Sequence, residues 1–423
     1  MGQRKPFLGL EGTALSWAIS LTSASAFLLF GYDQGIMGSI IATPYFLQAV
    51  NIEASDAETI STVVSIYDIG CMVGCLVAAV WGGTLGRKRT IFYGMGIMVV
   101  GAILQTASYS VAQLIAGRVV SGIGNGMNTG TVPAYISEVS RARSRGKLVA
   151  TQLSIAAFGI VIAYWMNYGF FHLSGQILTV VAFQIVFALI TMCVIPSLPE
   201  SPRFLYSKGR NEEADIVMSA LKALPLEHEI VQAERAEILA AIALEDHFGE
   251  YNIKTIFYDK SGQKIPLRIG LVCLIQAIQQ LPGVNVSIPN VSSMRNDAHF
   301  GAVLVVGGRR YHPPWLIGAE LCPVRYRHVG SAMNAFTNWA FTFIIVKTGP
   351  IGLADIGWRL YIVFIIFIAF QFPIVWFLYP ETKGRSLEDI DTLFVKDETF
   401  TQTLGEKSEM VRHLEGHKTS IAA

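Results

Sequence analysis

Long apolar runs, each close to the length that crosses a lipid bilayer, are the feature that most limits what this chain can fold into. About 20 apolar residues in a helix span the hydrocarbon core, where no water is present to satisfy an open strand or loop. The runs lie near residues 14–36, 60–82, 91–107, 111–136, 148–168 and 177–196, and then near 269–285, 331–348 and 358–379. Since 52% of the 423 residues are hydrophobic and 15% are charged, the sequence predicts an all-α integral membrane protein with about nine clear spans.

The charge balance and the cysteines exclude several other classes of protein. Lys and Arg number 32 against 31 Asp and Glu, so there is no basic excess for binding nucleic acid. The five cysteines are scattered, which indicates neither a disulfide framework nor a zinc site. No catalytic triad, paired carboxylate or metal-ligand cluster stands out. We therefore expect a protein that is not an enzyme, needs no cofactor or metal, and has the lipid bilayer as a partner.

The basic residues are placed in alternate loops. They occur at Arg4 and Lys5, within residues 86–90 and 141–147, and from Arg203 onward. Because positively charged loops stay in the cytoplasm, this pattern predicts a cytoplasmic N-terminus and a cytoplasmic linker. The predicted parts are an N-terminal six-span bundle (1–202), a linker with amphipathic helices (203–266), an incomplete C-terminal bundle (267–394) and a cytoplasmic tail (395–423).

Two motifs occur once in each half of the chain, in the same order. The first is Pro133-x-Tyr135-x-x-Glu138 followed by Arg145-Gly146, repeated as Pro314-Trp315 and Glu320 followed by Arg325, Arg327 and Gly330. The second is Pro199-Glu200, repeated as Pro380-Glu381. Such a repeat predicts two parallel six-span halves. The second half is shorter by about 70 residues, enough for roughly three spans. Since nine spans would also place the C-terminal basic residues outside, we expect the missing spans between Asn285 and His312.

Two ionisable residues lie inside predicted spans. Asp33 falls in the first span and Arg118 in the fourth, and an ionised side chain at mid-membrane costs about 2.5–3.5 kcal/mol on insertion scales. We expect the two to face each other, so that the carboxylate can bind and release a proton as a cavity opens to alternate sides. The structural alternatives are a static ion pair between the two spans, or two side chains that reach to the membrane surface.

The fourth span has glycine at every fourth position, at Gly122, Gly126 and Gly130. The stretch does not match the G-x-G-x-x-G nucleotide loop, because Met127 stands at the third glycine position and no strand precedes it. Small residues at this spacing let helices approach closely in lipid. We therefore expect the fourth span to pack tightly against its neighbours.

Polar amides lie within the apolar runs, where they need a partner. They are Gln152 in the fifth span and Gln276, Gln279, Gln280 and Asn285 in the seventh. Amides offer the paired donors and acceptors that a polyhydroxyl substrate needs, and Trp315 and Trp339 could provide flat apolar walls. The alternative is that the amides only hydrogen-bond neighbouring helices to one another.

Together these motifs resemble those of the sugar porter family of the major facilitator superfamily, particularly its fungal hexose and polyol proton symporters. The resemblance is carried by residues 31–35, Gly117-Arg118, Pro133-x-Tyr135-x-x-Glu138 with Arg145, residues 199–203, Gln279-Gln280-x-x-Gly283-x-Asn285, Trp315 with Glu320 and Arg325, Asn338-Trp339, and residues 380–385. It implies two six-helix bundles that transport a sugar with a proton by alternating access, with the plasma membrane as the expected location.

The resemblance also implies roles for individual residues. Asp33 opposite Arg118 would couple the proton. The sugar would be bound by Gln152, Gln279, Gln280, Asn285, Trp315, Asn338 and Trp339. A cytoplasmic gate would be formed by Arg87, Glu138, Arg145, Glu200, Arg203, Glu320 and Arg325.

The chain departs from the family pattern in three places. Gly83 and Thr84 stand where the family usually has an acidic residue and Arg, and Thr342 stands where it usually has a second Asn. Residues 286–311 resemble nothing in the family and replace the end of the seventh span, two further spans and part of the tenth. We interpret this as a deletion or a misjoined gene model. The alternative functions are a glycerol or other polyol transporter, a membrane nutrient sensor on the same fold, and a product that does not transport.

Overall fold

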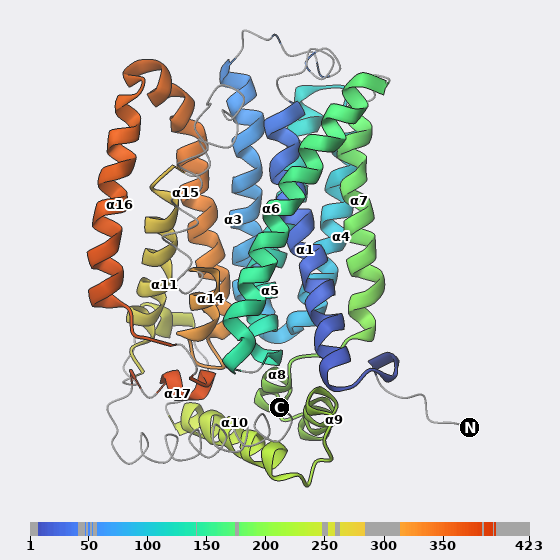
Figure 1. Cartoon of the computed structure of the whole chain (residues 1–423), viewed down its shortest axis with the longest axis vertical. Helices are drawn as coiled ribbons and strands as arrows, with labels where there is room; N and C mark the ends of the chain where they lie inside the picture. Colours follow the sequence, from blue (N-terminus) through green and yellow to red (C-terminus); the bar gives the residue numbers. More distant parts are fainter. Residues whose placement is uncertain are drawn as a thin grey trace, which may run out of the picture.

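A computed structural model of the chain describes residues 7–40, 47, 50, 53, 57–140, 142–173, 177–247, 253–258, 263–283, 314–382, 385–391, 393 and 394. Every regular element within these residues is a helix, so the predicted all-α fold is confirmed (Figure 1). The helices of the bundle are α1 (Gly12–Ile40), α3 (Ala57–Leu85), α4 (Arg87–Thr106), α5 (Val111–Val139), α6 (Ala142–Leu173), α7 (Ile177–Val194), α11 (Ile265–Gln280), α14 (Pro314–Glu320), α15 (Arg327–Ile356) and α16 (Arg359–Leu378).

Each of the nine predicted apolar runs coincides with one of these helices. Among the described residues, seven helices are long and apolar enough to cross a membrane, namely α1, α3, α4, α6, α7, α15 and α16. α11 is apolar but has 16 residues. α5 carries polar residues along its length, and nearly all of its residues 121–138 are buried. Its neighbours therefore shield α5 from lipid, which is why it can be less apolar than the others.

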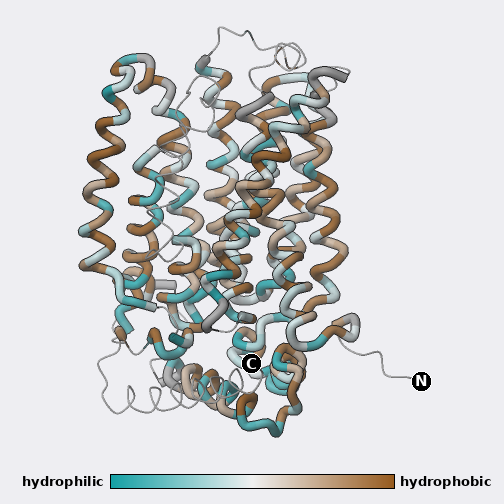
Figure 2. The backbone as a smooth tube through the Cα atoms, viewed as in Figure 1, coloured by the Kyte–Doolittle hydropathy of each residue, from teal (hydrophilic) through white to brown (hydrophobic). Residues whose placement is uncertain are grey.

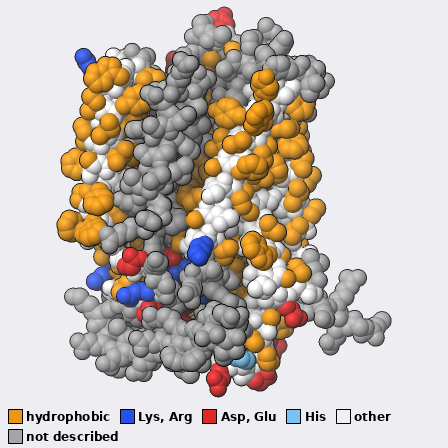
Figure 3. Space-filling model, in the orientation of Figure 1, with side chains coloured by type: hydrophobic (Ala, Val, Ile, Leu, Met, Phe, Trp, Pro, Cys, Tyr) orange, Lys and Arg blue, Asp and Glu red, His pale blue; other side chains and the backbone are white. Residues whose placement is uncertain are grey.

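The outer surface of the bundle is apolar. Orange side chains cover the described faces of the helices, whereas charged side chains gather below them (Figure 3). Large apolar residues such as Trp17, Trp165 and Phe377 are 63%, 69% and 81% exposed. Along α16 only Phe364 is buried. An apolar surface of this extent would be unstable in water, and it fits contact with lipid tails.

Shorter helices lie at one end of the bundle and differ from it in hydropathy (Figures 1 and 2). They are α8 (Pro202–Ser207), α9 (Asn211–Lys222), α10 (Glu229–His247) and α17 (Leu387–Asp391). α9 buries Ala214, Val217, Met218 and Leu221, the spacing of an amphipathic helix. α1 also begins here, because a Cβ added to its first residue would lie 2.9 Å from Ala223. We call this end of the bundle the linker end.

Glycines let α5 touch two neighbouring helices closely. A Cβ added to Gly122 or Gly126 would lie 2.4 Å or less from a backbone oxygen of α3, and one added to Gly124 would lie 2.4 Å from the carbonyl oxygen of Gly94 in α4. Gly130 faces α15, with its added Cβ 3.3 Å from a backbone carbon. The expected tight packing is present, and it joins α5 to the second half of the chain as well as to the first.

The substitution Gly126→Ala should destabilise the protein, because α3 must move away to make room for the methyl group. Overpacking of this kind costs about 1–3 kcal/mol. Gly270→Ala is the matched control, since a Cβ at Gly270 in α11 would have no neighbour within 4 Å. We expect a lower thermal unfolding midpoint in detergent for Gly126→Ala and no decrease for Gly270→Ala. Equal midpoints for wild type and Gly126→Ala would contradict the close contact between α3 and α5.

Candidate functional site

The structure brings Asp33 of α1 and Arg118 of α5 together in the interior. Nη1 of Arg118 lies 3.8 Å from Oδ2 of Asp33, and the two side chains are 3% and 1% exposed. Arg118 also donates hydrogen bonds to the carbonyl oxygens of Val63 and Val64, and its guanidinium lies 4.5 Å from the ring centre of Tyr67. Neither oxygen of Asp33 accepts a hydrogen bond from the described residues. The carboxylate is therefore held mainly by the charge of Arg118, with the hydroxyl of Tyr67 also close to it.

Several of the predicted sugar-binding amides are buried without a protein partner. Both amide atoms of Gln152 in α6 and of Gln276 in α11, and Oε1 of Gln279, make no hydrogen bond within the described part of the chain. A buried polar group left in this way costs about 1–3 kcal/mol, and such groups are rare in folded proteins. Gln152 belongs to the first half and Gln276 and Gln279 to the second, so a polar ligand bound by all three would lie between the halves.

Gln280 behaves differently. Its Nε2 donates a hydrogen bond to Oδ1 of Asn338 in α15. This pair joins α11 to α15 and fits the interhelical alternative for the amides. Asn285, the last predicted amide, lies outside the described residues.

The two predicted tryptophan walls belong to an aromatic cluster that crosses between the halves. The ring of Phe30 in α1 lies 6.1 Å from Trp315 and 5.5 Å from Trp339, measured between ring centres. Nε1 of Trp339 donates a hydrogen bond of 3.1 Å to Thr129 in α5. Trp339 is only 1% exposed, so in this state it serves as packing between the halves and offers no open face.

Two buried ion pairs join the halves at the linker end. Nε of Arg145 lies 2.7 Å from Oε1 of Glu320. In the second pair the arginine comes from the second half, and Nη1 of Arg327 lies 3.7 Å from Oε1 of Glu138 in the first half. The same oxygen of Glu138 accepts a 2.7 Å hydrogen bond from Arg87. All of these side chains are at most 3% exposed. The halves can separate at this end only if these pairs break.

Arg325 does not lie in these pairs, although it is one of the predicted gate residues. Its Nε is 3.8 Å from Oε2 of Glu245 in α10, and the same carboxylate accepts the backbone N–H groups of Val324 and Arg325. The nearby Arg327, which is completely buried, takes the place opposite Glu138. Arg325 thus contacts the linker, and the arginine that reaches across to the first half is Arg327.

The repeat contained the signal that identifies Arg327. Arg145 follows Glu138 by seven positions, and Arg327 follows Glu320 by seven positions. Aligning the repeats on their glutamates pairs the two arginines, each of which binds the glutamate of the opposite half. The family resemblance had instead implied Arg325 as the gate residue.

The remaining predicted gate residues, Glu200 and Arg203, connect the linker to α4, α5 and α17. Glu200 accepts the backbone N–H groups of Arg87 and the next residue, at 3.1 and 3.2 Å, and so caps the N-terminus of α4. Arg203 donates two hydrogen bonds to Glu388 of α17, at 2.7 and 3.1 Å, and one of 2.6 Å to the carbonyl oxygen of Glu138. Burial by itself would raise the pKa of Glu388, but Arg203 lowers it to about 2.

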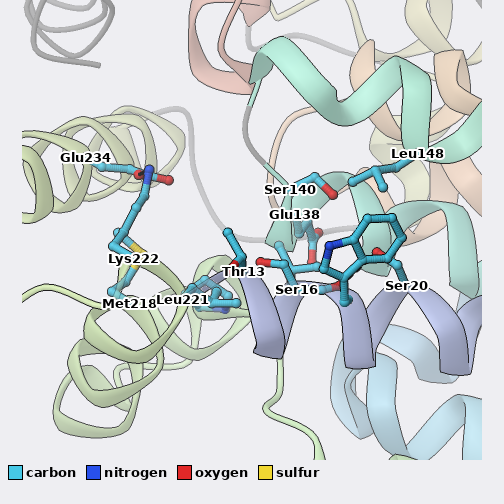
Figure 4. Close-up of a pocket in the computed structure, with 13 residues that line it drawn as sticks. Thr13, Ser16, Ser20, Glu138, Ser140, Leu148, Met218, Leu221, Lys222 and Glu234 are labelled. Carbon is cyan, nitrogen blue, oxygen red and sulfur yellow. Dashed lines mark hydrogen bonds and ion pairs between the residues drawn. The ribbon is translucent and has the colours of Figure 1, made fainter. Parts of the chain in front are cut away.

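A cavity of about 280 Å³ lies at the linker end between α1, the ends of α5 and α6, and the linker helices. Figure 4 shows Ser16 and Ser20 of α1 on one side and the ion pair of Lys222 with Glu234, at 2.5 Å, on the other. Of the predicted site residues only Glu138 lines it. The cavity therefore borders Glu138, a predicted gate residue, and is not lined by the predicted sugar-binding residues.

The linker also contains an acidic residue that the sequence analysis did not single out. Glu237 of α10 accepts a hydrogen bond from the hydroxyl of Ser386. Burial, together with the nearby charge of Glu388, raises the pKa of Glu237 to about 8. The linker end thus holds a carboxyl group that titrates near neutral pH.

The pKa of Glu237 predicts a pH-dependent stability. Because it is raised from 4.5 to about 8 on folding, the folded protein keeps a proton that the unfolded chain loses, and this stabilisation is lost as the pH rises through that range. We expect the thermal midpoint of the wild type to fall relative to Glu237→Gln between about pH 5 and pH 8. The exposed Glu212 provides the control Glu212→Gln, which should follow the wild type. A wild-type to Glu237→Gln difference that is constant with pH would contradict this assignment.

Comparison with known proteins identifies the family. The family described as sugar (and other) transporter matches residues 19–308 and 312–394. The chain belongs to this family. Its members are transporters, which is not a class of enzymes, and the expected resemblance to major facilitator sugar porters is confirmed.

Curated fungal proteins are similar to this transporter over most of their length. It is 32% identical to the MFS-type transporter oryC of Aspergillus oryzae, over 93% of this chain and 88% of the relative. It is 30% identical to the sugar transporter STL1 of Saccharomyces cerevisiae, over 92% and 83%, and 24% identical to a high-affinity glucose transporter of Kluyveromyces lactis, over 96% and 90%.

The alignment with the Aspergillus oryzae relative also bears on the expected gap. It has 471 positions whereas this chain has 423 residues, so the relative contains segments that are absent here. The family match includes residues 286–308, so the resemblance extends further than the motifs indicated. The match is interrupted at 309–311, inside the range where the sequence predicts missing spans. That the second bundle lacks spans of the family stays a prediction.

Solved structures confirm the major facilitator fold. The proton:xylose symporter XylE bound to 6-bromo-6-deoxy-D-glucose superimposes with a TM-score of 0.69 at 19% identity, covering 90% of this chain and 100% of that chain. The inward-open conformation of XylE from E. coli gives a TM-score of 0.64 at 17% identity, covering 90% and 100%.

Proposed function

We propose that this transporter moves a monosaccharide across the membrane together with a proton, by alternating access. The observation that carries the sugar assignment is a set of amides from both halves that lack hydrogen bonds within the described residues, namely both amide atoms of the buried Gln152 and Gln276 and Oε1 of the half-buried Gln279. Amides present donors and acceptors side by side, which match adjacent hydroxyl groups of a sugar. The relatives named for sugar and glucose support the same class of substrate.

Proton coupling is assigned to Asp33. As long as its carboxylate is ionised, its attraction to Arg118 holds α1 against α5. Protonation removes that attraction, which is strong in a low-dielectric interior. Phe30 lies three residues before Asp33, on the same face of α1, and contacts both Trp315 and Trp339. A shift of α1 at Asp33 would therefore be transmitted to the aromatic contacts between the halves.

The gate is assigned to the cross pairs of Arg145 with Glu320 and Arg327 with Glu138. Both hold the linker end closed in this state. The density of arginine there supports placing the linker end, and with it the N-terminus, in the cytoplasm. The coupling pair is nearer to the opposite end, since Arg118 is seven positions from the start of α5. Protons would thus enter from the outer side of the plasma membrane.

Replacing Asp33 tests the coupling. In a yeast host without its own hexose transporters, Asp33→Asn should abolish sugar accumulation driven by an acidic medium and leave downhill uptake in place. Labelled glucose, xylose and glycerol, each at two values of pH, would measure it and would separate monosaccharide from polyol. Glu58→Gln, an exposed acid at the start of α3, is the control that should behave as wild type. Unchanged accumulation in Asp33→Asn would contradict the coupling role.

Replacing Gln152 tests the sugar site. Gln152→Ala removes hydrogen bonds worth about 1–1.5 kcal/mol, so we expect an apparent KM about tenfold higher with little change in maximal rate. Gln232→Ala, an exposed amide of α10, should leave KM unchanged. Equal KM values for Gln152→Ala and wild type would exclude Gln152 from the sugar site.

The alternatives give different results in the same experiments. Sugar binding by the purified chain without uptake in cells would favour a nutrient sensor. Absence of both binding and uptake would identify a product that does not transport, as the incomplete second bundle could cause.

A further inference from the structure

Asp68 of α3 is a second carboxylate in the interior of the bundle, beside the pair of Asp33 and Arg118. Its exposed fraction is 3%. It makes no hydrogen bond or ion pair within the described residues. A buried carboxylate without a donor is costly when ionised, so its presence in a membrane helix calls for a physical explanation.

The helix geometry directs Asp68 toward Arg118. Asp68 follows Val64 by one turn, and the carbonyl oxygen of Val64 accepts a 3.1 Å hydrogen bond from Nη2 of Arg118. Side chains on a helix lean toward its N-terminus, so the carboxylate points to the turn that holds the guanidinium. The charges of both Arg118 and Asp33 act on Asp68. The three side chains therefore form one cluster, contributed by α1, α3 and α5.

The cluster has one more potential negative charge than positive. With both aspartates ionised, the single guanidinium would leave a net charge of −1 in the interior. Thiols of α3 and the amide of Asn125 in α5 lie nearby and are uncharged groups. Besides Arg327 at the linker end, α15 contributes Lys347, whose ammonium donates hydrogen bonds to Ser61 and Thr62 near the start of α3. Thr62 is about 9 Å along the helix from Asp68 at 1.5 Å per residue. Keeping one proton on the two carboxylates would remove the excess charge.

We propose that Asp33 and Asp68 share one proton beside Arg118, and that this is the proton carried by the transporter. The inference rests on the proposed proton-coupled function. In the loaded state one carboxyl group has an O–H bond and the other is ionised against Arg118, so the cluster is neutral. On release the O–H bond breaks, the electron pair stays on the oxygen and the proton passes to water. Two neighbouring carboxylates that titrate together in this way behave as one site.

Infrared spectroscopy of the purified full-length protein tests the shared proton directly. We expect the carboxylic acid C=O band at neutral pH to be smaller by the same amount in Asp33→Asn and in Asp68→Asn, because the remaining aspartate is then held ionised by Arg118. Glu58→Gln on the same helix should keep the band, and so should Asp68→Glu, which retains the acid if the fold is preserved. Signals from the linker acids, such as Glu237, cancel in difference spectra. A C=O band of wild-type size in Asp33→Asn would show that Asp68 holds a proton of its own. A band of wild-type size in Asp68→Asn would show that Asp68 holds no proton in the wild type. Either result overturns the proposal.

Uptake in cells tests whether this proton is the one transported. Asp68→Asn leaves Asp33 alone beside Arg118, where it ionises more readily, so half-maximal sugar uptake should need at least about a tenfold higher proton concentration than in wild type. An unchanged pH midpoint in Asp68→Asn overturns the coupling role of Asp68. If the wild-type chain shows no uptake at any pH while the infrared result is as expected, the transport function is overturned and the shared proton is confirmed.

Discussion

A charge inside a membrane protein must be neutralised by another part of the same protein, and the arrangement of this chain depends on that constraint. Arg118 is bound by two backbone carbonyl groups, an aromatic ring and Asp33, so it ties α5 to both α3 and α1. At the linker end, Arg145 and Arg327 each need a glutamate from the opposite half. The same requirement that keeps these charges paired therefore also holds the halves of the transporter together.

The ion pairs at the linker end and the pair of Asp33 with Arg118 differ in the strength of their contacts. At the linker end Arg203 and Glu388 share two hydrogen bonds, and Arg145 reaches Glu320 at 2.7 Å. Asp33, in contrast, is 3.8 Å from Arg118 and accepts no hydrogen bond from the described residues. Charge-assisted hydrogen bonds are stronger and more directional than an ion pair at longer range. The ion pairs at the linker end are thus held by short charge-assisted hydrogen bonds, whereas Asp33 is held more loosely, as the proposed gate and the proposed coupling site require.

Close packing allows these contacts to form. Gly122 and Gly126 bring the backbone of α5 against α3, which places Arg118 within reach of the carbonyl oxygens of Val63 and Val64. A larger residue at these positions would separate the helices and leave the guanidinium without two of its acceptors. Residues that follow α7 also fix the ends of these helices, since Glu200 caps α4 and Arg203 donates a hydrogen bond to the carbonyl oxygen of Glu138 at the end of α5.

The sequence by itself determined the membrane location, the helices of the first half and the family, because apolar length, charge placement and repeated motifs are local properties. It also led to Asp33 with Arg118 and to most of the gate. Only the tertiary structure decided that Arg327 rather than Arg325 faces Glu138, that Trp339 is enclosed, and that Asp68 is buried. These outcomes depend on which face of a helix meets its neighbour, and that is set by contacts between residues far apart in the chain.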